Sequence, residues 1–191
     1  MRFLLYLKPW ALFTLLVAIP ITLQIISNLA LFTQPIQFHL FLLGFITSMV
    51  FMMGGLFSWL WTLGIQLQKL LPDGIVLPTG RLKAALLLPA VYILTILAGL
   101  VSVSNGAFFE PASASILPLF AVVFPLHLLS MAAIFYSLYL VAKALKCVEL
   151  QQAARFSEFL GEFFMLWFFP VGIWMIQPRI NRLFASAASI R

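Results

Sequence analysis

The eleven Lys and Arg residues of this chain fall into three clusters, and the long apolar stretches between the clusters contain no Lys or Arg. These basic residues are Arg2, Lys8, Lys69, Arg81, Lys83, Lys143, Lys146, Arg155, Arg179, Arg182 and Arg191. Short loops rich in Lys and Arg stay on the cytoplasmic side of a membrane. Each of the two apolar stretches between the clusters is long enough to cross the membrane twice. All three clusters can then lie on the same side. This arrangement predicts four spans with cytoplasmic N- and C-termini.

Composition supports this threading. The chain is 64% hydrophobic and 8% charged, whereas a soluble domain has about 25% charged residues. A span needs about 20 apolar residues to cross a ~30 Å hydrocarbon core. We predict an all-α membrane protein, a four-helix transmembrane bundle within residues 1–155, with spans at about 9–32, 38–67, 84–103 and 116–141. The net charge of +6 indicates attraction to anionic lipids rather than binding of nucleic acid.

Residues 156–191 follow the bundle as a C-terminal segment with a cytoplasmic tail. Residues 156–176 are apolar enough for a fifth span, but Glu158 and Glu162 would then lie in the membrane, where carboxylates are costly. On a helix these two residues lie on one face, and aromatic side chains lie on the opposite face. This is the pattern of a helix lying in the membrane interface. We expect an interfacial helix or a re-entrant hairpin bent at Pro170, with a second short helix from Pro178. A fifth span is the alternative.

The second predicted span carries a stripe of small residues at intervals of three, four or seven positions, consisting of Gly44, Ser48, Gly55, Ser58 and Thr62. Small residues let membrane helices approach closely, so this helix is predicted to be the packing centre of the bundle. Gln24 and Asn28, one turn apart in the first span, are expected to hydrogen-bond between helices. Trp59 and Trp61 are expected in the aromatic belt at the inner membrane surface.

The C-terminal part of the sequence resembles a known group of proteins. The residues that carry the resemblance are Tyr139–Glu149 and Glu162–Asn181, which include the run Phe168-Phe169-Pro170-Val171-Gly172. They resemble the end of a group of small, uncharacterised bacterial integral membrane proteins. The resemblance implies a bacterial, multi-span protein of the cytoplasmic (inner) membrane, and it implies no activity.

His127 lies near the middle of the fourth predicted span, two residues after Pro125. Ionisable groups inside membranes are rare and often functional. One hypothesis makes His127 a proton-relay or ligand-binding residue, with the carbonyl group freed by Pro125 as its partner. The other makes it a neutral histidine bonded between helices, and we expect the latter. We predict no metal site, because His39 lies near the outer end of its span at a different depth.

Glu158 and Glu162 are one helical turn apart. Paired carboxylates can act as general acid and base or bind a cation, but we expect them to pair with Arg155, Arg179 or Arg182. The aromatic residues beside them are Phe163, Phe164, Trp167, Phe168, Phe169 and Trp174. They suit the membrane interface, with a pigment or quinone pocket as the alternative.

Four cations near this segment are predicted to meet lipid head groups. They are Lys143, Lys146, Arg179 and Arg182. The single cysteine, Cys147, is expected to be inert, with acylation as the alternative. The sequence contains no phosphate-binding loop and no zinc spacing, and we predict no cofactor.

These patterns predict a small membrane subunit or scaffold that is not an enzyme and that packs against partner helices. Its expected partners are membrane lipids and a second membrane protein or further copies of itself. Two alternatives remain. One is an oligomeric transporter or channel for ions or small solutes that uses His127, and the other is a membrane-embedded lipid-active enzyme that uses Glu158 and Glu162.

Overall fold

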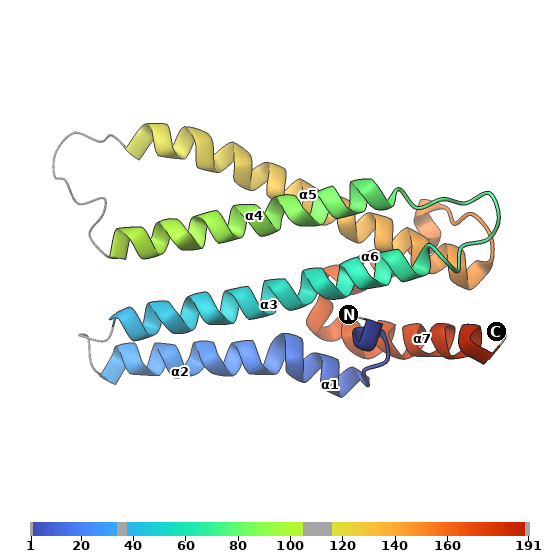
Figure 1. Cartoon of the computed structure of the whole chain (residues 1–191), viewed down its shortest axis with the longest axis horizontal. Helices are drawn as coiled ribbons and strands as arrows, with labels where there is room; N and C mark the ends of the chain where they lie inside the picture. The colour runs from blue at the N-terminus through green and yellow to red at the C-terminus, as the bar shows by residue number, and fades with distance from the viewer. Residues whose placement is uncertain (1, 34–37, 105–115, 190–191) are drawn as a thin grey trace.

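The computed structural model describes residues 2–33, 38–104 and 116–189. Its helices, after a single 3-10 turn at Arg2–Leu5, are α1 (Pro9–Phe13), α2 (Ile19–Thr33), α3 (Phe38–Leu67), α4 (Thr79–Ser104), α5 (Ile116–Leu150), α6 (Phe156–Trp167) and α7 (Phe169–Ser189). Within these residues, four helical segments are long and apolar enough to cross a membrane: Pro9–Leu29, Phe38–Leu67, Thr79–Ser102 and Ala121–Leu150. The predicted all-α fold with four possible spans is confirmed (Figure 1).

The first span contains one wide turn. Between α1 and α2, residues Thr14–Ala18 form a π-helical turn. Pro20 follows directly and has no N–H to donate to the carbonyl of Leu16, so the regular α-helical pattern cannot continue through this point. A Cβ atom at Gly55 of α3 would overlap the Leu16 side chain. The π-helical turn therefore contacts Gly55 at the place where the first and second candidate spans pack against each other.

Two helices extend beyond the predicted spans. The third span was predicted to begin at about residue 84, and α4 begins at Thr79, five residues earlier. The fourth span was predicted to end at about residue 141, and α5 continues to Leu150. Gln151 has a φ of 53°, a left-handed conformation that ends a right-handed helix.

The C-terminal segment forms a helical hairpin. Twelve residues make α6, about 18 Å at 1.5 Å per residue, which is too short for a crossing. The chain turns at Phe168, and α7 runs back so that its end lies at the same end of the molecule as the start of α6 (Figure 1). The predicted second helix from Pro178 was wrong, because α7 begins at Phe169 and contains Pro178.

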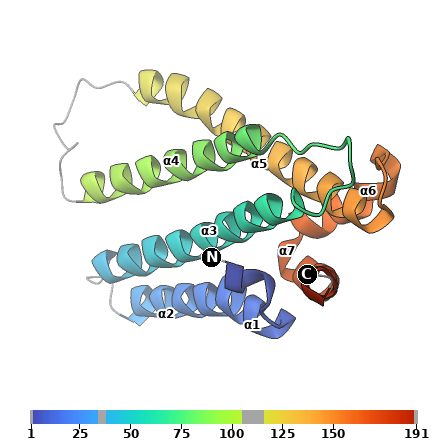
Figure 2. The same cartoon turned by 45° about the vertical axis from the view of Figure 1, so that its right-hand side comes forward.

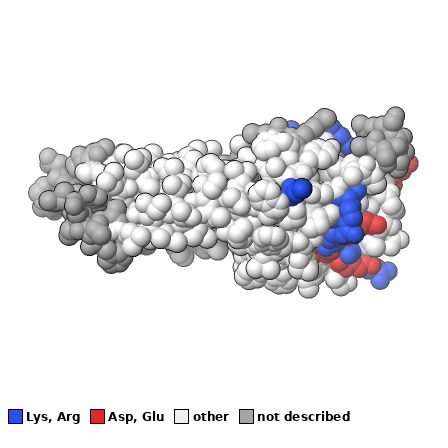
Figure 3. All heavy atoms as spheres, turned by 90° about the horizontal axis from the view of Figure 1, so that it is seen from below, with Lys and Arg blue, Asp and Glu red and all other residues white. Residues whose placement is uncertain are grey.

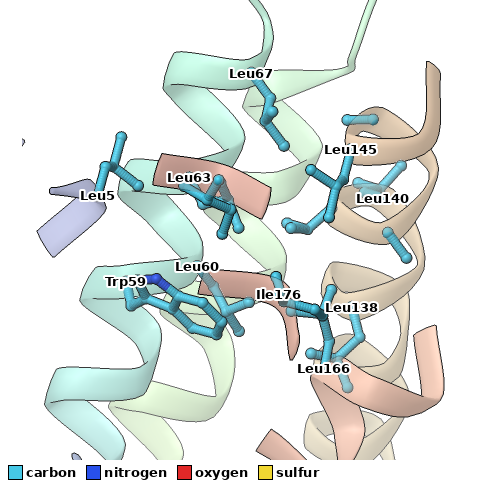
Figure 4. Close-up of a cluster of buried hydrophobic side chains, with 14 of the residues drawn as sticks. Leu5, Trp59, Leu60, Leu63, Leu67, Leu138, Leu140, Leu145, Leu166 and Ile176 are labelled. Atoms are coloured by element: carbon cyan, nitrogen blue, oxygen red, sulfur yellow. The ribbon is translucent and has the colours of Figure 1, made fainter. Parts of the chain in front are cut away.

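The helices pack most tightly at the end of the molecule that holds α6 and α7. The buried core there joins α3, α5, α6 and α7 to the first residues of the chain (Figure 4). Toward the other end, α2 and α3 stay together, whereas α4 and α5 diverge (Figures 1 and 2). From Ala121 to Leu129, α5 has no buried residue. This part of α5 is therefore loosely packed, and it meets α4 through His127 and Tyr92.

Described charged side chains gather at the tightly packed end. On the face that Figure 3 shows, Lys, Arg, Asp and Glu all lie at that end, and the long apolar part of the molecule carries none. The order of the helices produces this pattern, because α3 ends, α4 begins and α5 ends there. Arg191 lies outside the described residues.

The small-residue stripe of α3 meets the first span. A Cβ atom at Gly44 would overlap Ser27 of α2, and the Ser48 hydroxyl donates to Gln24 Oε1 over 2.9 Å. The predicted hydrogen bond between helices is present for Gln24, whereas Asn28 accepts from Gln24 within α2 over 3.2 Å. Farther along α3, the Thr62 hydroxyl donates to the carbonyl of Ser58 over 2.7 Å.

Candidate functional site

Four charged residues from three helices form one ion network at the packed end. Arg179 of α7 donates from Nε to Glu149 Oε1 of α5 over 2.7 Å, and its Nη2 also donates to Glu149 Oε2. The same Nη2 lies 2.6 Å from Glu162 Oε1 of α6. Lys146 of α5 completes the network, with Nζ 3.2 Å from Glu162 Oε1 and 3.7 Å from Glu149 Oε2. The network ties α5, α6 and α7 together.

The network fixes the ionisation of its members. Burial by itself raises the pKa of the Glu162 carboxyl, but hydrogen bonds from Arg179, its own backbone and Lys146 lower it by more, so the pKa lies below its ordinary value. Hydrogen bonding to Glu149 is the largest cause that raises the pKa of Arg179 above its ordinary value. Both residues are therefore charged near neutral pH, and Glu162 is 5% exposed.

Glu158 has a different role from Glu162. Its Oε2 accepts the backbone N–H of Arg155 over 2.6 Å, at the start of α6, and a carboxylate in the first turn of a helix is favourable. The predicted pairing with arginine side chains is present for Glu162 with Arg179. The two carboxylates do not form the acid–base pair that the lipid-active enzyme would need, because one caps a helix and the other is buried in the ion network.

A second polar centre, missed from the sequence, surrounds Gln177 of α7, which is fully buried. Its Nε2 lies 2.9 and 3.1 Å from the carbonyl oxygens of Leu4 and Leu7 and 3.2 Å from Asn181 Oδ1, so its two hydrogens are shared among three acceptors. Its Oε1 accepts from Trp59 Nε1 over 3.2 Å. Asn181 Nδ2 donates to the Leu7 carbonyl over 3.1 Å. The centre holds the first residues of the chain against α3 and α7.

The belt position predicted for Trp59 was wrong. Trp59 is fully buried, because its indole N–H bonds to Gln177 in the core. Trp61 is half-buried, and Lys83 Nζ lies 5.6 Å from the centre of its ring. A cation over an aromatic ring near the charged end is consistent with a membrane interface at the level of Lys83.

His127 bonds between helices. Its Nδ1 lies 3.1 Å from Tyr92 Oη of α4, and the ring centres are 5.7 Å apart. His127 is exposed on the surface of the described chain, so it does not line an enclosed cavity between these helices. Ser130, one turn farther along α5, is 3% exposed, and its hydroxyl has no hydrogen-bond partner among the described residues.

Two of the four cations predicted at lipid head groups are engaged inside the protein. Lys146 and Arg179 belong to the ion network. Arg182 is exposed and bonds to its own helix, with Nε 3.4 Å from the Pro178 carbonyl. It lines an open depression of about 520 Å³ together with Glu149, Arg179, Leu183 and Ser186. Lys143 is half-buried on α5.

Four of the six aromatic residues in the predicted cluster pack in a row at α6, whereas Phe169 and Trp174 lie on α7, where Trp174 contacts Phe13. Rings of Phe163, Phe164, Trp167 and Phe168 contact one another in succession. Trp167 meets Phe135 of α5 edge-on, with ring centres 4.9 Å apart. This row therefore fastens α6 to α5 and leaves Trp167 and Phe168 exposed at the hairpin turn.

Cys147 is buried and accepts the backbone N–H of Ala154 over 3.3 Å. This bond holds the connection between α5 and α6. A thiol that is 1% exposed is shielded from reagents, so the geometry favours the inert role.

No protein-family model, curated protein or solved structure matches this chain. Function is therefore inferred from the geometry of the described residues. That geometry offers a rigid charged end and a loosely packed apolar end.

Proposed function

We propose that this chain is a non-enzymatic subunit or scaffold of a bacterial cytoplasmic membrane, which packs its spans against the helices of a partner protein. In this proposal both termini are cytoplasmic. The gathering of described charged side chains at one end supports that orientation (Figure 3), because loops rich in Lys and Arg stay in the cytoplasm.

One observation carries the proposal. The carboxylates on α5 and α6 are all engaged in holding the protein together, since Glu149 and Glu162 bind Arg179 and Glu158 caps α6. Hydrolytic and transfer enzymes need an accessible acid, base or nucleophile. Glu162 is buried, and one oxygen of the exposed Glu158 already accepts a backbone N–H. The remaining surface of the spans is apolar and suited to other helices or lipid.

The α2–α3 pair offers a surface for such a partner. Exposed apolar side chains line both helices, including Ile21, Ile25, Ile26 and Leu29 of α2 and Leu40, Leu43, Val50 and Phe51 of α3. Small residues already join these two helices closely, so the pair presents one stiff, broad face. In a membrane such faces associate by packing rather than by a hydrophobic drive.

The α6–α7 hairpin fits the cytoplasmic interface in this proposal. Trp167, Phe168 and Trp174 are exposed aromatic residues of the kind that favour the head-group region. Of the four cations predicted to meet lipid head groups, Arg182 and Lys143 remain available for lipid phosphates, because Arg179 and Lys146 are paired with carboxylates.

An oligomeric transporter or channel that uses His127 is the second candidate. Its support is one observation, the exposure of His127 on the surface of its span, because only an assembly of copies could enclose that residue in a path. It predicts that His127→Ala abolishes flux while the protein still folds.

The test is gentle extraction of tagged protein from its native membrane, followed by quantitative mass spectrometry of what remains bound. The subunit proposal expects a second polypeptide in fixed stoichiometry, which is lost from an Ile25→Trp/Val50→Trp variant that alters the α2–α3 face. The matched control is Val91→Trp on α4. Recovery of only this chain would overturn the subunit proposal and favour the transporter.

A further inference from the structure

We propose that a second copy of this chain docks on the α4–α5 face, where Tyr92 and His127 of one copy hydrogen-bond reciprocally with His127 and Tyr92 of the other. This inference does not depend on the partner protein proposed above, because it uses the other helical pair.

Within one copy, the Tyr92–His127 pair keeps one hydrogen atom that is not used in a hydrogen bond. A neutral imidazole has one N–H, and a tyrosine has one O–H. The contact between Tyr92 Oη and His127 Nδ1 uses one of these two hydrogens, and neither residue has another hydrogen-bond partner among the described residues. If Tyr92 donates, the Nε2–H of His127 is left over. If His127 donates, the O–H of Tyr92 is left over.

The pair also retains an acceptor in both cases. When Tyr92 donates, its oxygen keeps a free lone pair, and when His127 donates, its Nε2 keeps one. The spare donor and the spare acceptor are therefore always Nε2 of His127 and Oη of Tyr92, in one order or the other. A pair with one spare donor and one spare acceptor is complementary to itself.

In this proposal the Tyr92–His127 pair lies deep in the membrane. Tyr92 follows Lys83 by nine positions on α4, about 14 Å at 1.5 Å per residue. With Lys83 at the interface, the pair lies near the middle of a ~30 Å hydrocarbon core. There an unsatisfied polar hydrogen cannot bond to water, so leaving it unpaired is unfavourable.

A dimer of two copies that are inserted in the same direction can be symmetric about an axis along the membrane normal. Copies threaded in the same direction are related by an axis along the membrane normal, which places identical residues at equal depth. Tyr92 and His127 bond to each other and so lie at similar depth. His127 Nε2 of one copy can then meet Tyr92 Oη of the other, and the same contact recurs across the axis, as a two-fold interface requires.

The surrounding surface is free to accept a neighbour. No residue of α5 from Ala121 to Leu129 is buried. Phe124 and Met131, three positions before and four after His127, are 57% and 42% exposed, and Ile96 lies exposed one turn from Tyr92 on α4. These side chains would flank the two reciprocal bonds.

Cysteine cross-linking in liposomes of purified protein tests the docking face. In a Cys147→Ser background, Phe124→Cys or Met131→Cys is expected to form dimers with a short bis-maleimide. The control Ile25→Cys, equally exposed but on α2, is expected to remain monomeric. Cross-linking from Ile25→Cys alone, or from none of the three, would overturn the proposal.

The dimerisation constant, measured by dilution in lipid, tests the two bonds. A hydrogen bond between membrane helices contributes about 0.6–1.7 kcal/mol, so loss of both is expected to weaken dimerisation roughly 7- to 300-fold. Dimerisation should weaken to a similar extent in three variants, namely Tyr92→Phe, His127→Phe and the double variant. Either single change removes both reciprocal contacts, so the second change adds nothing. Ile25→Phe should leave dimerisation unchanged.

Unchanged dimerisation in all three variants would overturn the reciprocal bonds. Each variant also removes the bond between Tyr92 and His127 within one copy, so the thermal stability of the monomer is measured in parallel. A fall in dimerisation no larger than the accompanying loss of monomer stability would also overturn the reciprocal bonds. Partner recovery from native membranes is a separate measurement, so loss of the dimer and loss of the partner protein are distinguishable.

Discussion

Trp59 and Gln177 lie 118 positions apart in the sequence, and the indole nitrogen of the first is 3.2 Å from the amide oxygen of the second. The amide nitrogen of the same Gln177 reaches the carbonyls of Leu4 and Leu7. One buried side chain therefore joins the second span, the last helix and the beginning of the chain.

Replacement of Gln177 by Met is expected to destabilise the protein by about 2–4 kcal/mol. Met has a similar shape but no amide, so it leaves the Trp59 N–H and the Leu4 carbonyl without their Gln177 partner, whereas the Leu7 carbonyl keeps its bond from Asn181. Thermal unfolding in detergent, followed by tryptophan fluorescence, measures the loss. Gln152→Met, at an exposed site, is the control, and equal stability of the two variants would contradict the role of Gln177.

Glu162→Gln is expected to cost about 1–3 kcal/mol at neutral pH, because hydrogen bonds to charged groups are replaced by weaker ones. The variant should also change the pH dependence. The pKa of Glu162 in the folded protein lies below 4.5, so its contribution to stability is present above pH 4.5 and is lost as pH falls through the lower, folded pKa.

Unfolding temperatures from pH 7 down to the acid limit of solubility check this sign. The difference between wild type and Glu162→Gln should be constant above pH 4.5 and shrink below it. A difference that grew on acidification would show that the carboxyl is protonated in the folded protein.

Gly172→Ala is expected to open the α6–α7 hairpin. A Cβ atom at Gly172 would overlap the carbonyl oxygen of Met165, which is backbone and cannot move aside alone, and overpacking of this kind costs about 1–3 kcal/mol. Gly161→Ala is the matched control, since nothing lies within 4 Å of its added Cβ. Limited proteolysis near residues 168–172 reports the opening, and equal cleavage of both variants would exclude it.

Gly44→Ala should separate α2 from α3, whereas Gly54→Ala should not. The added carbon at Gly44 would overlap Ser27, but nothing lies within 4 Å of the one at Gly54. Because Ala favours a helix over Gly by about 1 kcal/mol, Gly54→Ala should be neutral or stabilising. Thermal unfolding of the two variants gives the comparison, and a reversed order would show that Gly44 is not a contact point.

Much of the fold could be predicted because membrane spans follow from local composition. Apolar length and the positions of Lys and Arg were enough to locate four spans. The pairing of Glu162 with Arg179 could also be anticipated, because a carboxylate beside a membrane needs a cation and few cations were available. The start of α4 at Thr79 does not follow from hydropathy, because Arg81 and Lys83 lie in its first turns, where long basic side chains can extend away from the apolar region.

Contacts between distant helices were harder to predict. The sequence does not show that Glu149 meets Arg179, because the two residues are 30 positions apart on different helices. Gln177 and Trp59 each fit a surface pattern, and only tertiary packing shows that they meet. The available signal was the pair Gln177 and Asn181, two amides one turn apart after the apolar run Phe168–Ile176.

The hydrogen bonds from Gln177 and Asn181 to the carbonyls of Leu4 and Leu7 have a consequence for biogenesis. A ribosome releases residues 4 and 7 first and residues 177 and 181 only after all four spans have emerged. The contact of Gln177 and Asn181 with the carbonyls of Leu4 and Leu7 can therefore form only after the four candidate spans have been synthesised, and not during their synthesis.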